Sequence, residues 1–315
     1  MSSIRVDQTS EKGQGVFALR TFQRSDLIIS EKPLFTMKYS FGEDPCEFLA
    51  EKIRALDRDS QRQFFALSNT LKTEIKNPLL AIFTTNAIPM GADTLNAALY
   101  LTFSRFNHSC ASNAAYCWNS AAKEERLYAM REIKAGEEIT VSYIDEKMYC
   151  EARVQRRQAI LQGFNFLCQC AACNVEDSSA SDKRRIELGR SGMLTVQAFS
   201  FDPSRALSIV RNTLNLLAAE GHFGIMAQAV YYNASQVCVT HGDIARGVAF
   251  AMLAKQRRHE CQGVDCDKLG VLERAIEEPT EHPMALITQR WLSRMSDRLA
   301  PDAEGFQEWL WERAS

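Results

Sequence analysis

Three cysteines within six residues constrain this chain more than any other feature. The stretch FLCQCAAC places Cys168, Cys170 and Cys173 in a C-x-C-x2-C array. Three thiolates this close can bind one tetrahedral ion, but a closed zinc site requires a fourth ligand. Spacing alone does not choose between Cys110 and Cys150 for that ligand. Two alternatives stay open: an iron–sulfur cluster held by the same thiolates, and buried cysteines without a metal.

The cellular setting bears on how these cysteines are used. The start, MSSIRVDQTSEKGQG, lacks the apolar core of a secretory signal, and no window offers about 18 uninterrupted apolar residues. We therefore expect a soluble protein of the cytoplasm, the nucleus or both, with no membrane partner. In a reducing compartment, clustered cysteines more often bind metal or serve catalysis than form disulfides. The net charge of −2 gives no global reason to bind nucleic acid, and we expect no direct nucleic-acid partner.

The first half of the chain mixes short strands with one helical segment. Residues 12–38 combine β-branched and aromatic residues with turn residues, which predicts short strands. Residues 126–133 and 137–144 flank the Gly-containing turn KAG and predict a hairpin. A helix is predicted within residues 46–71, where the apolar residues recur at helical spacing and form a stripe of Phe48, Leu49, Ile53 and Leu56.

The second half is predicted to be helical. Residues 174–184 are polar and predict a linker or loop. From about residue 186 the pattern is amphipathic, and the short HGD turn at 241–243 predicts an antiparallel pair of helices. The alanine-rich faces suit a tetratricopeptide-like array, although no clean 34-residue repeat is present.

Three polar motifs of the first half have both a structural and a functional interpretation. The glycines of KGQG, residues 12–15, allow close approach of a ligand but also suit a plain tight turn. Asn107 and His108 follow the apolar run ALYLTF, where their polar groups require partners in the protein or in a ligand. Tyr143 lies on a predicted strand, as a packed ring or with its hydroxyl in a reaction channel.

Taken in order, these segments resemble a SET domain, the fold of protein lysine methyltransferases that use S-adenosylmethionine. The chain is most similar to the SET-and-MYND family and its fungal relatives, in which a helical insert splits the SET core and a tetratricopeptide-like domain follows. It departs from that family in lacking a MYND-type zinc finger. The matching segments are KGQGVFA at 12–18, TNAI at 85–88, RFNHSC at 105–110, AGEEITVSYID at 135–145 and GFNFLCQCAAC at 163–173.

The resemblance implies an α+β fold with three parts. These are a SET domain of short strands over 1–163, split by a helical insert at about 45–80, a zinc-binding post-SET segment over 164–175, and an all-α tetratricopeptide-like domain over 186–315. We expect a monomer whose helical domain binds a peptide partner.

The resemblance also assigns residues to sites. It implies that Cys110 joins the three clustered cysteines around one structural zinc ion. The positions that would contact S-adenosylmethionine are Lys12, Gly13, Gly15, Asn86, Asn107, His108 and Phe166, the last stacking on adenine.

The implied reaction is methyl transfer from S-adenosylmethionine to the lysine side chain of a histone or another protein. Tyr143 matches the active-site tyrosine that orients the attacking nitrogen. Phe164 stands where the SET-and-MYND enzymes have a second tyrosine, so the lost hydroxyl changes the number of methyl groups added or weakens the activity. Two other functions stay open: a SET-fold scaffold that recruits partners through its helices, and an enzyme acting on a small molecule.

Overall fold

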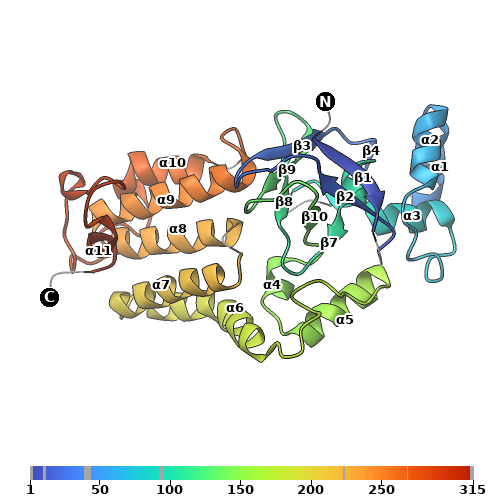
Figure 1. Ribbon diagram of the computed structural model, residues 1–315. Helices are drawn as coiled ribbons and strands as arrows, with labels where there is room; N and C mark the ends of the chain where they lie inside the picture. The colour runs from blue at the N-terminus through green and yellow to red at the C-terminus, as the bar shows by residue number, and fades with distance from the viewer. Residues whose placement is uncertain are drawn as a thin grey trace. The chain divides into compact units, whose positions relative to one another are not determined.

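The computed structural model describes residues 3–9, 12–38, 44–91, 95–222, 224–267 and 269–312. The chain divides into two compact units. Unit 1 comprises Met1–Asp145 and Arg153–Glu176, and unit 2 comprises Glu146–Ala152 and Asp177–Ser315. Figure 1 shows the short strands in unit 1 and the long helices in unit 2.

Unit 1 is built on three small β-sheets with the strand orders β1-β2-β10-β7, β3-β9-β8 and β4-β6-β5. Most neighbouring strands are antiparallel, but β7 and β10 are parallel and pair Asn107 with Thr140 and His108 with Val141. A tight turn cannot join parallel strands, so two stretches distant in the sequence meet here. The strands are β1 Ile4–Gln8, β2 Gln14–Ala18, β3 Leu27–Glu31, β4 Phe35–Lys38, β5 Ile88–Pro89, β6 Asn96–Leu99, β7 Asn107–His108, β8 Ala114–Asn119, β9 Glu124–Ala129 and β10 Glu138–Val141.

The hairpin predicted from residues 126–133 and 137–144 is wrong. Strand β9 pairs with β3 and β8, whereas β10 pairs with β2 and β7. Between them, Ile133 is fully buried and exchanges backbone hydrogen bonds with Phe22. Burying Ile133 in the core directs the chain away from β9, and the turn at Gly136, with its φ of +87°, leads into a different sheet.

The helical segment of unit 1 consists of three short helices, α1 Pro45–Arg54, α2 Arg58–Phe65 and α3 Pro78–Asn86. Each begins at a side chain that accepts backbone N–H bonds, namely Asp44, Asp57 and Asn77. Leu49 and Ile53 of the predicted stripe are buried and share a core with Phe35 and Phe83, whose rings stack at 5.9 Å. The insert therefore packs on strands β4 and β6.

A further helix of unit 1, α5 Arg153–Phe164, precedes the loop that carries the three clustered cysteines. Its residue Ile160 is fully buried against them. The helix thus packs an apolar side chain against this loop.

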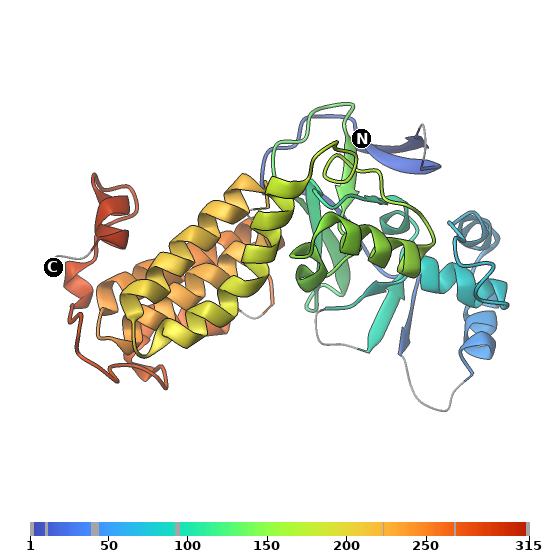
Figure 2. The same ribbon diagram turned by 90° about the horizontal axis from the view of Figure 1, so that it is seen from below.

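Unit 2 is all helical, and Figures 1 and 2 show α6 to α9 lying side by side. Helix α6 begins at Ser179, earlier than the predicted start at about 186, so it takes up much of the predicted linker. Helices α8 and α9 pack closely at Gly247. A Cβ at that position would lie only 2.5 Å from Val239 Cγ2, so the close approach requires glycine. The helices are α4 Glu146–Tyr149, α6 Ser179–Phe199, α7 Pro203–Ala219, α8 Ile225–Thr240, α9 Ile244–Gln262, α10 Gly270–Glu277 and α11 Phe306–Trp311, with 3-10 turns η2 Pro279–Glu281 and η3 Met295–Asp297.

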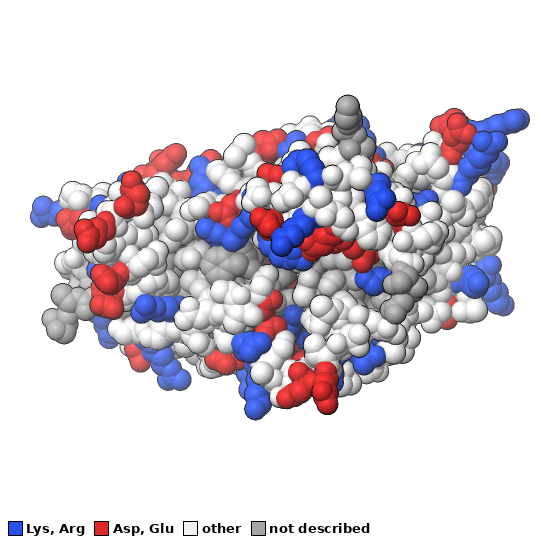
Figure 3. All heavy atoms as spheres, viewed as in Figure 1, with Lys and Arg blue, Asp and Glu red and all other residues white. Residues whose placement is uncertain are grey.

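The α+β class is confirmed by this arrangement of small sheets and helices. On the face drawn in Figure 3, basic and acidic side chains are interspersed, which fits the net charge of −2. No helix in the described part of the chain is both long enough and apolar enough to cross a membrane.

Candidate functional site

The candidate site is organised around β7, the two-residue strand in the middle of RFNHSC. The chain approaches β7 through the 3-10 turn η1, Phe103–Arg105. The Glu31 carboxylate fixes this approach by accepting backbone N–H bonds from Leu101, Thr102 and Phe103 at 2.9 to 3.1 Å. Three N–H groups that begin a helical turn thus find an acceptor in a side chain from β3.

The segment that follows RFNHSC is fixed to β10 by the buried side-chain amide of Asn113. Asn113 accepts the Thr140 N–H at 2.8 Å and donates to the Glu138 carbonyl oxygen at 2.9 Å. Between these ends, Ser109 N–H donates to Val141 O, and the Ser109 hydroxyl accepts the Ala111 N–H. The whole stretch is therefore held against one edge of β10.

Three of the predicted cofactor residues, Lys12, Gly15 and Asn107, lie against the carboxylate of Glu138. Lys12 Nζ lies 3.1 Å from Glu138 Oε2, and Asn107 Nδ2 donates to Glu138 Oε1 at 2.8 Å. Gly13 has a φ of +73°, in the region that favours glycine. A Cβ at Gly15 would lie 2.9 Å from both Asn107 Nδ2 and Glu138 Oε1, so only glycine fits there without movement.

Glu138 itself was not among the predicted site residues. It belongs to the motif AGEEITVSYID, but a charged residue near a turn is usually a solvated one, and only the fold brings it to Lys12 and Asn107. The signal that could have found it is the position of a carboxylate at the start of a strand otherwise made of apolar and β-branched residues.

The predicted cofactor residue Asn86 is not joined to this group by any contact of its side chain among the described residues. Its amide donates to the carbonyl oxygens of Ser68 and Ile82, both at 2.7 Å. The buried side chain therefore joins the last turn of α3 to the backbone at Ser68 by hydrogen bonds. Its link to the site runs through the backbone, where the Ser104 hydroxyl donates to the Asn86 carbonyl oxygen at 3.4 Å.

The His108 side chain connects two other parts of the site. Its Nδ1 accepts the Tyr143 N–H at 3.0 Å, which leaves the proton on Nε2. Nε2 lies 3.3 Å from Cys110 Sγ, within reach of a donated hydrogen bond to sulfur. The imidazole is buried, and its ring centroid lies 6.5 Å from that of Phe166. His108 thus bridges the backbone of Tyr143 and a predicted metal ligand.

Tyr143 lies between the sheet core and the cysteine cluster. Its hydroxyl donates to the Phe106 carbonyl oxygen at 2.6 Å, and its ring centroid lies 4.8 Å from that of Phe164. Burial, together with the nearby Tyr116 and Glu138, raises the pKa of Tyr143 above its ordinary value. At neutral pH the group is therefore a neutral phenol, suited to orienting a substrate by hydrogen bonds rather than to removing a proton.

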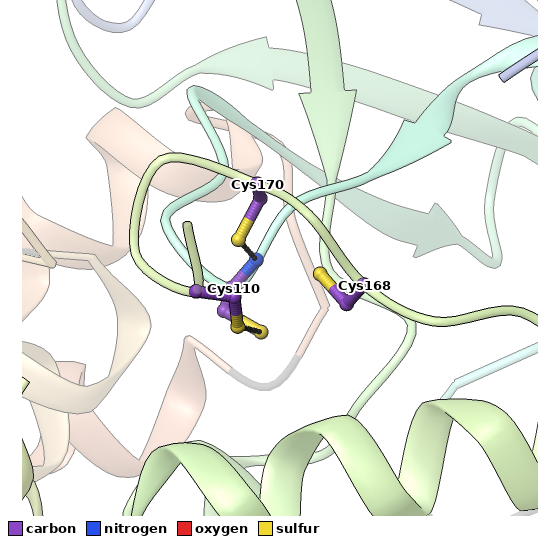
Figure 4. A group of neighbouring side chains, drawn as sticks. Cys110, Cys168 and Cys170 are labelled. Carbon is purple, nitrogen blue, oxygen red and sulfur yellow. Dashed lines mark hydrogen bonds between the residues drawn. The ribbon is translucent and has the colours of Figure 1, made fainter. Parts of the chain in front are cut away.

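The four predicted metal ligands lie together. The Sγ atoms of Cys110, Cys168, Cys170 and Cys173 are all buried and within 4.8 Å of one another, whereas Cys150 belongs to unit 2. Figure 4 shows the Cys170 thiol turned toward the backbone of Cys110, whose N–H donates to it at 3.3 Å. The Sγ atoms of Cys110 and Cys173 are 3.6 Å apart. Zinc–sulfur bonds of about 2.3 Å in a tetrahedron require sulfurs about 3.8 Å apart, so the group has the dimensions of a zinc site.

The four thiols interact with one another. Hydrogen bonds among them lower the pKa of Cys168 and Cys170 and raise the pKa of Cys110 and Cys173. Zinc binds thiolates.

Comparison with known proteins agrees with this geometry. Residues 13–144 match the model of the SET domain family. The chain is 28% identical to the histone-lysine N-methyltransferase set5 of Schizosaccharomyces pombe over 284 residues, 89% of this chain and 86% of that protein. It is 36% identical to the histone-lysine N-methyltransferase SMYD3 of Mus musculus over 86 residues, 27% of this chain and 19% of that protein.

One solved structure also matches part of the chain. The Neurospora SET domain protein DIM-5, a histone lysine methyltransferase, matches 45% of this chain at 17% identity, with a TM-score of 0.25 over 52% of its own chain. Its TM-score is too low to bear on the fold, so the comparison rests on the sequence matches. They show that residues 13–144 are similar to the SET domain family. The relatives of the chain include histone-lysine methyltransferases. A relationship to the SET-and-MYND proteins is consistent with these matches.

The close approach at Gly15 yields a stability test. In Gly15→Ala, the added methyl group would displace Asn107 or Glu138, so we expect the free energy of unfolding to fall by about 1–3 kcal/mol. The matched control is Gly163→Ala in α5, where nothing lies within 4 Å of a Cβ and the helix gains up to about 1 kcal/mol. Urea unfolding of both variants measures the difference. Equal stability of the two would contradict the packing described around Gly15.

Proposed function

We propose that this chain is a protein-lysine methyltransferase that uses S-adenosylmethionine and holds one structural zinc ion. One observation carries the proposal: the half-buried Tyr143 packs against both the sheet core and the cysteine cluster, and its hydroxyl donates to the carbonyl oxygen of Phe106, the residue before β7. The SET-domain match and the histone-lysine methyltransferases among its relatives support the same activity.

The residues present fit the cofactor. Gly13 and Gly15 add no side chains of their own, Gly15 lies against Asn107, and the Phe166 ring offers an apolar face for a purine. Lys12 and Glu138 add one charge of each sign, which suits a ligand that carries both an amino and a carboxylate group. The bound cofactor supplies a methyl group on a positively charged sulfur.

The protein's part in the reaction is positioning. The neutral lysine nitrogen forms a bond to the methyl carbon as the carbon–sulfur bond breaks, and the bonding pair remains on sulfur. Because the Tyr143 hydroxyl proton is engaged by the Phe106 carbonyl, the lone pairs of the Tyr143 oxygen are left to meet the substrate amine. Holding nitrogen, carbon and sulfur in line contributes most of the rate, as in other displacements between preoriented groups.

The residues present also fit zinc, because four buried thiols lie within 4.8 Å of one another and a doubly charged cation would offset the charge of their ionised forms. Cys168, Cys170 and Cys173 belong to the loop after α5, while Cys110 belongs to the stretch beside β10. An ion bound by all four would tie this loop, with Phe164 and Phe166, to the core. The aromatic residues of the channel would then be held in place.

The substrate that we propose is a lysine of a protein, as the histone-lysine methyltransferase relatives suggest. A nuclear or cytoplasmic location suits such a substrate. The antiparallel helices of unit 2 support the prediction of a tetratricopeptide-like partner-binding domain. Phe164, which lacks a hydroxyl beside Tyr143, favours a second candidate, a SET-fold scaffold of weak activity.

Methyl transfer tests the activity directly. With labelled S-adenosylmethionine and a mixture of core histones and total cell extract, we expect the wild-type chain to label lysine in at least one protein. Tyr143→Phe removes a hydroxyl aimed at the reacting amine and should lower the initial rate by about 100-fold or more. Its cofactor binding, measured by calorimetry, should change little.

Tyr232→Phe is the control for this experiment, because it removes a tyrosine hydroxyl from helix α8 of unit 2. It should label protein at the wild-type rate. Cofactor binding without any transfer by the wild-type chain would favour the scaffold.

Zinc content tests the metal site. Elemental analysis of the purified chain should give about one zinc per molecule. Cys168→Ser removes a buried ligand and should lower both the zinc content and the free energy of unfolding, whereas Cys46→Ser, outside the group, should leave both unchanged. Iron in place of zinc, or full zinc retention in Cys168→Ser, would contradict the assignment.

A further inference from the structure

Helix α4 belongs to unit 2, although the chain on both sides of it belongs to unit 1. The chain leaves unit 1 after Asp145, forms α4 over Glu146–Tyr149 and returns to unit 1 at Arg153. Tyr143 lies three residues before α4, and α5, which leads to the cysteine loop, begins four residues after it. A segment held by unit 2 is therefore connected at one end to the proposed reaction centre and at the other to the cysteine loop.

Arg185 of α6 holds α4 by its last residue, Tyr149. The Arg185 side chain is 1% exposed, and its Nη1 donates to the Tyr149 carbonyl oxygen at 3.2 Å. The guanidinium carbon lies 4.1 Å from the centroid of the Tyr149 ring, a cation–π distance. Nε donates to the Glu220 carboxylate at 2.8 Å, which offsets the buried charge. One planar side chain thus fixes both the ring and the backbone of Tyr149.

A close approach between α6 and the residue after α4 adds a second contact. Cys150 is buried, and a Cβ at Gly189 would lie 3.1 Å from the Cys150 Cβ. Gly189 follows Arg185 by four residues, so both lie on one face of α6. Rotation about a side-chain bond cannot move a Cβ, so a methyl group at residue 189 would shift the backbone of Cys150 instead.

The link between α4 and Tyr143 has little slack. The Ser142 hydroxyl donates to the Ile144 carbonyl oxygen at 2.9 Å, and Ile144 packs against the cysteine cluster. Only Asp145 separates Ile144 from α4. A shift of α4 is therefore passed on to Tyr143 rather than absorbed by a long loop.

We propose that Arg185 is a positioning residue for methyl transfer: by holding α4, it sets the place of Tyr143 at the substrate amine. The inference rests on the proposed methyltransferase function. Tyr143 acts by orientation, and a misplacement of about 1 Å can cost about 100-fold in rate. The residues proposed to bind the cofactor, such as Lys12 and Asn107, lie on other parts of the chain and keep their positions. Loss of this hold should therefore lower the maximal rate and leave the KM for S-adenosylmethionine unchanged.

The contact at Gly189 provides the test that least disturbs the fold. Full-length variants are assayed with labelled S-adenosylmethionine and the protein that the wild-type chain labels most strongly in core histones and total cell extract. In Gly189→Ala, Cys150 has to shift by a few tenths of an ångström, so we expect the maximal rate to fall about 5- to 20-fold with an unchanged KM for S-adenosylmethionine. Gly192→Ala is the matched control and should keep the wild-type rate, because it adds the same methyl group to α6 where nothing lies within 4 Å of a Cβ.

Two further comparisons separate positioning from a loss of stability. The double variant Gly189→Ala/Cys150→Gly removes the opposing Cβ, so its rate should return toward the wild-type value. Arg185→Gln should lower the rate about tenfold or more, whereas Arg184→Gln, which breaks an ion pair with the same Glu220, should not. Circular dichroism checks that each variant is folded at the assay temperature.

The outcomes separate the two levels of the proposal. Equal rates in folded Gly189→Ala and Gly192→Ala, or a loss in Gly189→Ala that Cys150→Gly leaves unchanged, would overturn the positioning role. A rise in KM with an unchanged maximal rate would overturn it as well. No methyl transfer to lysine by the wild-type chain would overturn the proposed function, and the inference with it.

Discussion

The parallel pairing of β7 with β10 is the interaction on which the rest of unit 1 depends. Two backbone pairs, Asn107 with Thr140 and His108 with Val141, bring together stretches more than 30 positions apart. On one side of this junction lie Glu138 and its partners Lys12 and Asn107. On the other lie Cys110 and Tyr143, joined by the His108 imidazole. Two side chains support this short pairing, the half-buried Glu31 before β7 and the buried Asn113 after it.

This arrangement couples the proposed metal site to the proposed reaction centre. His108 can donate to Cys110 only as the Nε2 tautomer, and the Tyr143 N–H selects that tautomer by donating to Nδ1. A thiolate that binds zinc would strengthen the bond to Nε2 and so fix the ring. The position of Tyr143 is thereby linked to the cysteine group, whose other members lie about 60 residues later in the chain. Loss of the metal should loosen the site as well as the loop.

The sequence predicted the parts of this site that are local and missed those that depend on pairing. The helical stripe of Leu49 and Ile53 and the antiparallel helices around HGD follow from periodicity and short turns, and both are present in the structure. The hairpin after Ala129 was wrong because a single buried residue, Ile133, pairs with Phe22 and redirects the chain. No local pattern carries that information.

Side-chain roles were harder to predict than elements. His108 was expected at the cofactor, yet its two ring nitrogens are directed to Cys110 and Tyr143. The side-chain amide of Asn86 donates its hydrogen bonds to backbone carbonyl oxygens. The importance of Glu138 follows only from the residues that the sheets place beside it. Residue type and order indicate the class of chemistry, whereas the hydrogen-bond partners follow from the pairing of distant strands.

The most direct test is a crystal structure of the chain with S-adenosylhomocysteine, with diffraction measured at the zinc absorption edge. The account predicts an anomalous peak among the Sγ atoms of Cys110, Cys168, Cys170 and Cys173, with the nucleoside beside Asn107 and Phe166 and the cofactor sulfur directed toward the Tyr143 hydroxyl. A disulfide in the cysteine group, or a cofactor bound away from β7 with Tyr143 outside its reach, would contradict it.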